Sequence, residues 1–443
     1  MRTFLSGAVA AGVSLATFPA FGLQPLEAFL DGAHKRNPDM IAADASVRQK
    51  DAEADVARGK LLPSFTARGV YTRNQFEAVF NTPNGAITIL PQDQFDAFFL
   101  LDVPIVDAAQ FARYGGARIL KEIAEASKGL TQRAIDERVV RAYVTVAATT
   151  NLGRSAEKSF ELAEKNRKSV EDRVTAGVAS ELDLERAKAN VERAKQDIAD
   201  ANLSRVLAIR TLETLTRIKP EEATQFPEDD LHEEAPLASW VALADGNLPE
   251  RRLSEAERRL ALSTRDSAKL AFIPALGGQA QERFTNATGF AGRVGAYTLS
   301  ASLTFRFDFG LVAQLDSTRA AADVSVAKAE GVRRSSEDAI VEAWYRIGAS
   351  IAKGRAARAQ ARAATRAATI AEDRYAAGAA TQLDVTTAQR DAFAAEVGRI
   401  GADLDLTLAR AVLRLASGKP TTFRGPVPSA SPAPSAPPGE PSK

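Results

Sequence analysis

The sequence predicts a mainly α-helical protein with a small transmembrane β part, arranged as a duplicated helix–strand–strand–helix–helix unit. Three observations predict this fold. One residue pattern recurs at a constant offset through most of the chain. Two long regions lack proline and are rich in helix-forming residues. Short segments before them alternate apolar and polar residues, which is typical of half-buried strands.

The composition excludes most enzyme classes and gives no sign of a nucleic-acid partner. The 443 residues carry 57 Lys and Arg against 56 Asp and Glu, whereas nucleic-acid binding needs a strong basic excess. Zero cysteines remove disulfides, thiolate metal sites and cysteine nucleophiles. The two histidines, His34 and His232, leave little material for a metal centre or a histidine-dependent active site. We therefore expect no enzyme activity, no cofactor and no metal.

The first 22 residues are typical of a secretory signal peptide. Arg2 supplies a positive start, and residues 4–18 form an uncharged apolar stretch. Ala20 and Gly22 place small residues at positions −3 and −1 of a cleavage site before Leu23. A buried N-terminal helix is the alternative interpretation. The remaining chain contains no apolar run long enough for a membrane-spanning helix.

Nearly all of the remaining chain is an internal duplication. The pattern of residues 171–187 recurs 201 residues later at 372–388, and farther upstream the offset becomes 211. The predicted division is a first repeat at 23–217, an acidic connector at 218–235, a second repeat at 236–418, and a Pro/Ser/Ala-rich tail at 419–443. The composition of the tail predicts disorder.

Each repeat is expected to contain two long helices. We place them at about 107–174, 181–217, 311–375 and 382–417. A helix of about 60 residues spans roughly 90 Å, which exceeds the length of globular helices and indicates a coiled coil or helical barrel. Gly177 and Gly378 lie where the two helices of a pair must reverse direction, because glycine adopts left-handed backbone conformations at little cost.

Four segments are predicted to be strands, at about 64–76, 94–104, 275–285 and 295–308. Their alternation fits transmembrane β-strands, although a soluble sheet with one wet face has the same pattern. Four strands cannot close a barrel, so either several chains share one barrel or the strands form ordinary hairpins. Residues 79–93 contain Asn-Gly and two prolines, and we expect them to form the longer of two extracellular loops.

In these features the sequence resembles the TolC-like family of bacterial outer-membrane efflux proteins, over about residues 23–418. The resemblance rests on tandem Arg-x-x-x-Gly-x-x-x-x-Leu-Asp-x-x-x-Ala motifs at 173–187 and 374–388, on Asn37-Pro38, and on Val-Pro-Ile-Val-Asp at 103–107. It implies a homotrimer with a twelve-stranded outer-membrane β-barrel, continued by a long periplasmic α-helical barrel. It also implies an exit duct of a tripartite efflux or type I secretion system. The implied partners are a periplasmic adaptor protein, an inner-membrane transporter and outer-membrane lipid.

The resemblance further implies a periplasmic gate at the helix reversals. Tyr375 matches the family's constricting tyrosine, Asp183 the aspartate that this tyrosine hydrogen-bonds, and Asp384 a pore-facing aspartate of an acidic ring. The sequence departs from the family pattern at Ala380, where a gate-locking arginine is found, and at Thr387, where a second acidic ring would lie. The residues implied at the reversal tips and in adaptor docking are Gly177, Gly378, Arg173, Arg374, Leu182 and Leu383.

Several of these residues also have a simpler interpretation. Asp183 and Asp384 are carboxylates of the kind that helix N-termini favour. His232-Glu233-Glu234 has metal-ligating atoms but is more typical of a solvated connector. Four arginines share one helical face, which is typical of a solvated helix, while nucleic acid or anionic lipid is the alternative partner; they are Arg355, Arg358, Arg362 and Arg366.

The alternative for the whole chain is a periplasmic coiled-coil adaptor or structural protein. An adaptor would carry one helical hairpin inserted into domains of short strands. Here two predicted hairpins alternate with two strand pairs, which favours the channel.

Overall fold

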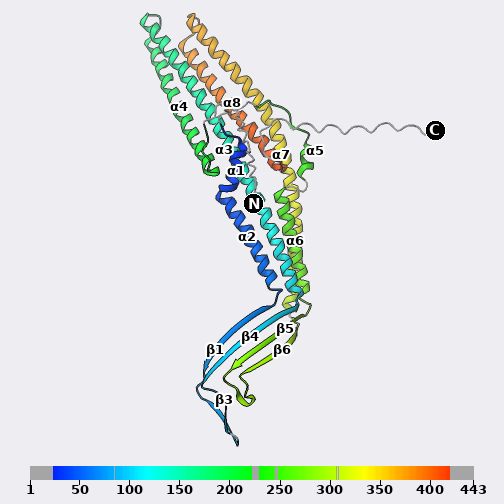
Figure 1. The fold of residues 1–443 in the computed structure, drawn as a ribbon. Coiled ribbons are helices and arrows are strands. Elements are labelled where there is room, and N and C mark those ends of the chain that lie inside the picture. Colours follow the sequence, from blue (N-terminus) through cyan, green and yellow to red (C-terminus); the bar gives the residue numbers. More distant parts are fainter. Residues whose placement is uncertain are drawn as a thin grey trace, which may run out of the picture.

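The computed structural model describes residues 23–83, 85–221, 229–244, 248–305, 307 and 309–419. The predicted signal peptide lies outside the described residues, as do residues 420–443 of the predicted tail and part of the predicted connector. Asp308, before the second long helix pair, also lies outside them. The described chain is elongated, with a helical body at one end and a β-sheet at the other (Figure 1).

The first repeat supplies four helices and four strands. In chain order they are α1 (Leu26–Arg36), α2 (Pro38–Gly59), β1 (Ser64–Arg73), β2 (Ala78–Thr82), β3 (Gly85–Leu90), β4 (Asp93–Val106), α3 (Ala108–Thr175) and α4 (Glu181–Thr216). The second repeat has the same order without the short hairpin. Its elements are α5 (Leu237–Ala244), α6 (Pro249–Leu270), β5 (Ala275–Thr285), the 3₁₀ turn η1 (Gly289–Ala291), β6 (Gly295–Thr304), α7 (Phe309–Ala376) and α8 (Gln382–Ala416).

Prolines set the early helix breaks. Pro38 is the first residue of α2, where its missing N–H costs no hydrogen bond. Asn37 caps this helix by accepting a hydrogen bond from the Asp39 amide at 2.9 Å. The Asn37 side chain also donates to the Leu215 carbonyl at 3.1 Å, which ties the break to the end of α4. Pro249 begins α6 in the same way.

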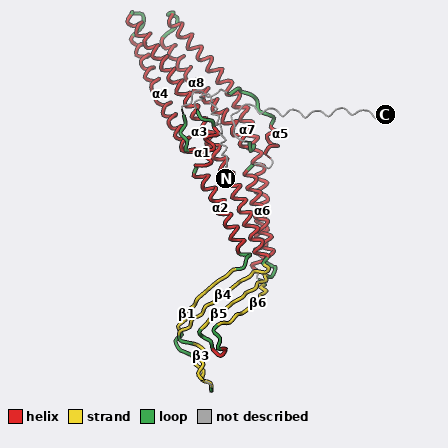
Figure 2. Tube along the Cα trace, in the orientation of Figure 1, coloured by secondary structure: helices red, strands yellow, loops and turns green. Residues whose placement is uncertain are grey.

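The helices α3 and α7 run through the whole helical body. Each has 68 residues, which corresponds to about 100 Å. Near the sheet they are flanked by α2 and α6, and at the far end they pair with α4 and α8 to form two antiparallel hairpins (Figures 1 and 2). The continuous helices α3 and α7 are therefore covered by two successive sets of shorter helices, α2 and α6 near the sheet and α4 and α8 at the far end.

The duplication is visible in two apolar cores at the middle of the body. One core joins α1, α3 and α4, and the other joins α5, α7 and α8. Residues at the predicted offsets occupy equivalent places; the pairs are Phe29 and Trp240, Ala33 and Ala244, Val139 and Ile340, Ala142 and Ala343, Val146 and Ile347, Ala208 and Ala409, and Leu212 and Leu413. The two repeats thus bury the same pattern twice.

One polar contact is duplicated as well. The Tyr143 hydroxyl donates to the Gln24 carbonyl at 3.2 Å, and the Trp344 indole N–H donates to the Ala235 carbonyl at 3.0 Å. Each contact satisfies an aromatic polar group and fixes the chain just before the first short helix of its repeat. Burial raises the pKa of Tyr143 to about 12, so this hydroxyl remains a donor at neutral pH.

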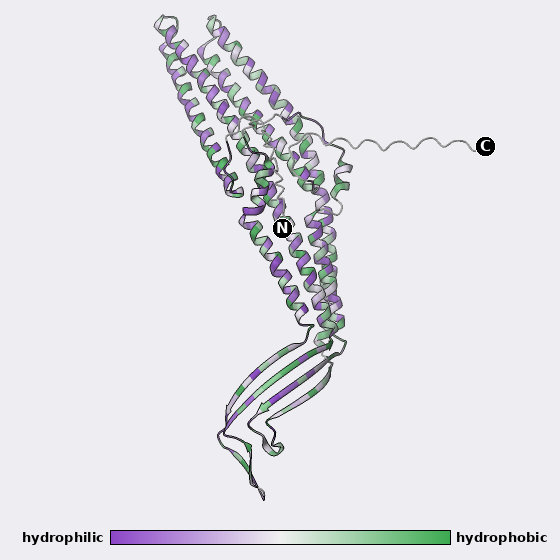
Figure 3. Ribbon diagram, in the orientation of Figure 1, coloured by the Kyte–Doolittle hydropathy of each residue, from purple (hydrophilic) through white to green (hydrophobic). Residues whose placement is uncertain are grey.

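The sheet is antiparallel and joins the two repeats in the order β1-β4-β5-β6. Its strand pairing places mainly apolar residues on one face, with Glu282 among them, and mainly polar residues on the other, with Val70, Phe98 and Leu100 among them. Hydropathy alternates along the strands (Figure 3). The apolar face contains Phe65, Ala67, Tyr71, Phe95, Ala97, Phe99, Leu101, Leu276, Ala280, Phe284, Tyr297, Leu299, Ala301 and Leu303. The polar face contains Ser64, Thr66, Arg68, Thr72, Gln94, Asp96, Asp102, Gln279, Gln281, Arg283, Thr298, Ser300 and Ser302.

The extent of the strands differs from the sequence expectation. The segment 79–93, expected to be the longer extracellular loop, contains β3 and most of β2, which pair as a hairpin. An Asn-Gly pair between alternating apolar residues is a hairpin signal. Arg73 ends β1 three residues before the expected end, and Thr304 ends β6 four residues early. No helix in the described part of the chain is both long and apolar enough to cross a membrane.

Candidate functional site

The two helix reversals at the far end of the body have the same backbone geometry. Gly177 and Gly378 adopt φ angles of 73° and 72°, in the left-handed region. The amide after each glycine donates to a carbonyl five residues earlier, from Val178 to Arg173 at 2.9 Å and from Ala379 to Arg374 at 2.7 Å. This is the Schellman arrangement, which satisfies the last carbonyls of α3 and α7. The repeated sequence pattern thus encodes two identical turns.

The helices that follow the turns begin with matching caps. Ser180 Oγ accepts from the Asp183 amide at 3.2 Å and donates to the Asp183 carboxylate at 2.7 Å. Thr381 and Asp384 form a full capping box at the start of α8. These hydrogen bonds with Thr381 hold the pKa of Asp384 below its usual range. Both aspartates therefore act as helix-terminal groups in the structure, and the pore-facing role expected of Asp384 stays a prediction.

The structure does not contain the expected hydrogen bond between Tyr375 and Asp183. The Tyr375 hydroxyl is buried and has no hydrogen-bond partner within the described residues. The Asp183 carboxylate is engaged by Ser180 instead. Burial raises the pKa of Tyr375, the Arg173 guanidinium opposes this shift, and the nearby Asp183 charge adds to it.

Arg173, and not a hydrogen bond between Tyr375 and Asp183, joins the tips of the two hairpins. Its guanidinium donates to the Tyr375 carbonyl at 3.0 Å and to the Ala376 carbonyl at 2.6 Å, and it stacks over the Tyr375 ring at 4.7 Å. A cation is favourable at a helix C-terminus, where unsatisfied carbonyls carry partial negative charge. The C-terminal end of α3 thus caps the C-terminal end of α7. The sequence motif predicted that Arg173 lies at the tip but not that it makes this contact.

The outer surface of the tips exposes apolar side chains next to these turns. Val178 is 72% exposed, Leu182 59% and Leu383 52%. The charge of Arg374 contributes to the lowered pKa of Asp384, after the hydrogen bonds from Thr381.

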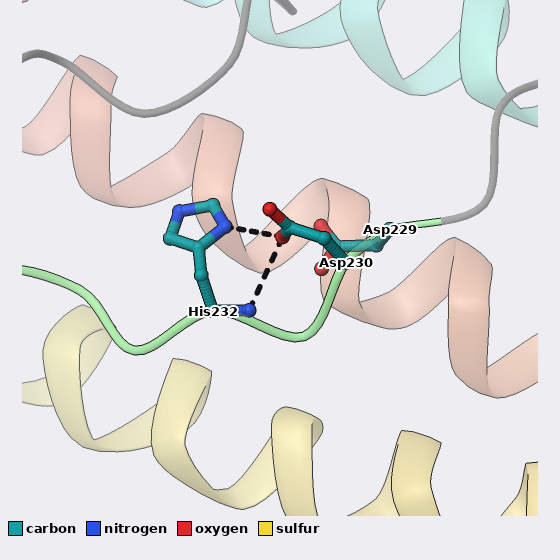
Figure 4. A group of neighbouring side chains, drawn as sticks. All are labelled: Asp229, Asp230 and His232. Carbon is teal, nitrogen blue, oxygen red and sulfur yellow. Dashed lines mark hydrogen bonds and ion pairs between the residues drawn. The ribbon is translucent and has the colours of Figure 1, made fainter.

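A second cluster lies in the connector between the repeats, where the sequence suggested metal-ligating atoms. Asp229, Asp230 and His232 place one potential ligand atom each within 4.8 Å of one another (Figure 4). His232 Nδ1 lies 2.5 Å from the Asp230 carboxylate. However, Arg410 of α8 already occupies the Asp229 carboxylate with bonds of 2.8 and 3.1 Å, and it also donates to the His232 carbonyl at 2.7 Å. The cluster therefore anchors the connector and does not form an open metal site.

The prediction that this acidic stretch is a solvated connector holds for the exposed Asp230 and Glu233 but is wrong for Asp229 and Glu234. The side chains of Asp229 and Glu234 are only 14% and 11% exposed, and Arg410 bridges them. Arg358 also departs from the predicted solvated face, since it binds Asp403 at 2.7 Å and the Asp229 carbonyl at 2.8 Å. The other three arginines of that face are exposed. These contacts depend on residues more than 40 positions apart, so no local pattern showed them.

A family model described as "Outer membrane efflux protein" matches residues 29–216 and 240–419, most of the chain. The chain belongs to the outer membrane efflux protein family. Proteins of this family are channels and not enzymes, and they lie in the outer membrane and extend into the periplasm. The predicted family is therefore confirmed, while an adaptor protein is not supported. The two matched segments agree with the two repeats.

Solved structures with the same fold cover nearly the whole chain. A membrane protein from Pseudomonas aeruginosa is 18% identical with a TM-score of 0.77, covering 94% of this chain and 99% of its own. The CmeC outer membrane channel of Campylobacter jejuni is 16% identical, with a TM-score of 0.76 and 94% of both chains covered. The MtrE outer membrane channel of Neisseria gonorrhoeae, in its open state, is 19% identical, with a TM-score of 0.74, 94% of this chain and 97% of its own. Curated protein sequences give no significant match.

Proposed function

We propose that three copies of this chain form an outer-membrane exit duct of a tripartite efflux or type I secretion system. In this duct, substrates pass from an inner-membrane transporter and a periplasmic adaptor protein to the outside. Family membership supports the outer-membrane efflux channel itself. The trimer, the partners and the gate are proposals, and each is supported below by features of this chain.

The observation that carries the proposal is a four-stranded sheet with two unpaired edges. Strands β1 and β6 each have a hydrogen-bonded neighbour on one side only. An open edge cannot remain unpaired in lipid, because its N–H and C=O groups find no water there. Pairing β6 of one copy with β1 of the next removes every edge when the ring closes. Three copies then give twelve strands, enough to enclose an aqueous lumen.

The faces of the sheet fit such a barrel. The apolar face would contact lipid, and the polar face would line the lumen. Aromatic residues lie toward both ends of the strands, with Tyr71 and Phe95 near the turns and Phe305 and Phe307 near the helices. Such girdles are typical of the two membrane interfaces. Among the described residues, the charged ones on the apolar face are Arg73 and Asp93, which pair at 3.2 Å next to the turn, and Glu282, three residues before the turn end of β5.

The tips of the two hairpins are the proposed gate and adaptor-docking region. Threefold repetition would bring three copies of Asp384 around the periplasmic mouth, and carboxylate rings attract cations. The turns at Gly177 and Gly378, the charges of Arg173 and Arg374, and the exposed Leu182 and Leu383 form the docking surface that we propose for the adaptor. In this gate Tyr375 would act through its contact with Arg173, and Asp183 through its nearby charge, without a direct hydrogen bond between them.

Disulfide crosslinking tests this proposal, because the chain has no cysteine of its own. Single cysteines on the edge strands are combined pairwise, for example at Ala67 in β1 and Ala301 in β6, together with neighbouring positions to find the register. We expect oxidation to yield covalent dimers and trimers from outer membranes, and wild-type protein to migrate as a heat-sensitive trimer. A matched pair on β4 and β6, which are not edge neighbours, should give no intermolecular product. A monomer released in soluble form by osmotic shock would contradict the proposal.

A further inference from the structure

The polar face of the sheet contains one row of residues with an unusual composition. Arg68 of β1, Phe98 of β4 and Arg283 of β5 are directly opposite one another in the strand register. The Arg68 guanidinium lies 4.9 Å from the centre of the Phe98 ring, and that of Arg283 lies 5.6 Å from it. An aromatic ring on the polar face is thus covered by two cations.

The two arginines differ in their charge balance. Arg283 forms a two-point ion pair with Asp96 through bonds of 3.0 and 2.8 Å. The Asp96 side chain is only 6% exposed, and its remaining oxygen accepts from Gln94 at 2.6 Å. Arg68 has neither an ion pair nor a hydrogen bond to any residue that the structure describes. The row therefore carries one uncompensated positive charge, on an exposed guanidinium.

Closing the barrel would not supply the missing partner. In the trimer proposed above, β1 would be paired with β6 of the next copy. The polar face of β6 offers no carboxylate, since it consists of Ala296, Thr298, Ser300, Ser302 and Thr304. Arg68 would therefore face the lumen with its N–H donors free and its plane held against Phe98. Three such groups would lie at one level of the barrel.

A guanidinium fixed on an aromatic ring is suited to a particular ligand chemistry. Its donors bind carboxylate, sulfonate or phosphate groups in a two-point manner, and its plane accepts stacking from a second ring. We infer that Arg68, together with Phe98 and Arg283, forms a lumenal binding site for aromatic organic anions, one in each protomer. This inference rests on the proposed trimeric barrel and assigns a class of substrate to its lumen.

Binding of pyrene-1,3,6,8-tetrasulfonate to the purified trimer tests this site, with fluorescence anisotropy as the readout. We expect saturable binding at three sites per trimer, weakened by salt because the contact is ionic. Arg68→Gln should raise the Kd about tenfold, the change expected from losing a hydrogen bond to a charged group. Arg68→Lys should raise it less, because the ammonium keeps the charge but not the planar stacking. Arg346→Gln, at an exposed arginine on α7, is the matched control and should leave the Kd unchanged.

The possible results separate this inference from the proposed function. If the wild-type trimer conducts in planar bilayers but Arg68→Gln binds the probe like wild type, the lumenal site is wrong and the channel stands. If inorganic sulfate displaces the probe as well as naphthalene-1-sulfonate does, the site recognises charge alone and the aromatic part of the inference is wrong. If the chain forms neither trimers nor channels, the proposed function fails and the site fails with it.

Discussion

Arg173 and Tyr375, 202 residues apart, connect the tips of the two helical hairpins through the Tyr375 carbonyl and ring. The contact joins the two repeats at the end of the body farthest from the sheet (Figure 1). The Arg173 guanidinium of the first repeat donates hydrogen bonds to carbonyls at the C-terminal end of α7 in the second repeat. The tips are therefore held together by a backbone contact that a change of the Tyr375 hydroxyl would leave intact.

Replacing Arg173 should loosen the closed tip. A hydrogen bond from a charged group contributes about 1.5–3 kcal/mol, so its loss changes a closed-to-open ratio by tenfold or more. We expect Arg173→Gln to raise single-channel conductance in planar bilayers. Tyr375→Phe is the matched control and should conduct like wild type, because the lost hydroxyl has no partner among the described residues. The reverse pattern, with Tyr375→Phe opening the channel, would favour a hydrogen bond from Tyr375 to Asp183.

Removing the charge of Asp384 should weaken cation block at the periplasmic mouth. We expect Asp384→Asn to reduce block by hexamminecobalt(III) about tenfold or more, since a triple ring of carboxylates would be lost. The asparagine side chain can still accept the cap hydrogen bond from Thr381, so the fold of the tip should persist. Asp183→Asn, at the equivalent cap of the other hairpin, is the comparison variant. Equal block of wild type and Asp384→Asn would place this residue outside the pore.

The same block should depend on pH in a defined direction. Hydrogen bonds from Thr381 lower the pKa of Asp384 in the folded protein, so this carboxylate keeps its charge to a lower pH than an ordinary aspartate. Because the pKa of Asp384 is lower in the folded protein than in the unfolded chain, the carboxylate is charged and capped at any pH above the unfolded-state pKa. This charged form is lost as the pH falls through the folded-state pKa. We expect cation block to be constant from neutral pH to about pH 5 and to decrease only below about pH 4. A decrease centred near neutral pH would implicate another group.

The repeated pattern in the sequence predicted the core positions and turns that occur once in each repeat. It did not predict contacts between residues far apart in the chain. The 201-residue offset anticipated that Val139 and Ile340 occupy equivalent core positions, because burial repeats with the pattern. The turns at Gly177 and Gly378 were predictable for the same reason. The Arg173 contact was not, because it depends on how two hairpins pack. The β2–β3 hairpin was missed because its turn signal was interpreted as a loop.

Arg410 should stabilise the connector between the repeats. Its side chain is only 8% exposed, and it compensates Asp229 and Glu234. Removing one partner of a buried ion pair costs about 3–5 kcal/mol, because the remaining charges lose their compensation. We expect Arg410→Met to lower the thermal stability of the trimer and to speed amide hydrogen exchange in peptides covering residues 229–236.

A surface arginine provides the control for this effect. Arg346 pairs with Glu342 one turn away, and both side chains are more than 60% exposed. Such pairs contribute about 0–1 kcal/mol, so Arg346→Met should change neither the melting temperature nor the exchange of the connector. If Arg410→Met also leaves both unchanged, the arginine does not anchor the connector.

Adjacent residues of β6 test which face of the sheet contacts lipid. Leu299 lies on the apolar face and Ser300 on the polar face, one position apart. An arginine on the lipid face of a barrel costs about 2–4 kcal/mol near the membrane midplane, whereas lumenal positions tolerate charge. We therefore expect Leu299→Arg to reduce the heat-sensitive trimer in outer membranes severely, while Ser300→Arg assembles normally. Equal assembly of both variants would show that this strand does not separate lipid from an aqueous lumen, and loss with Ser300→Arg alone would reverse the two faces.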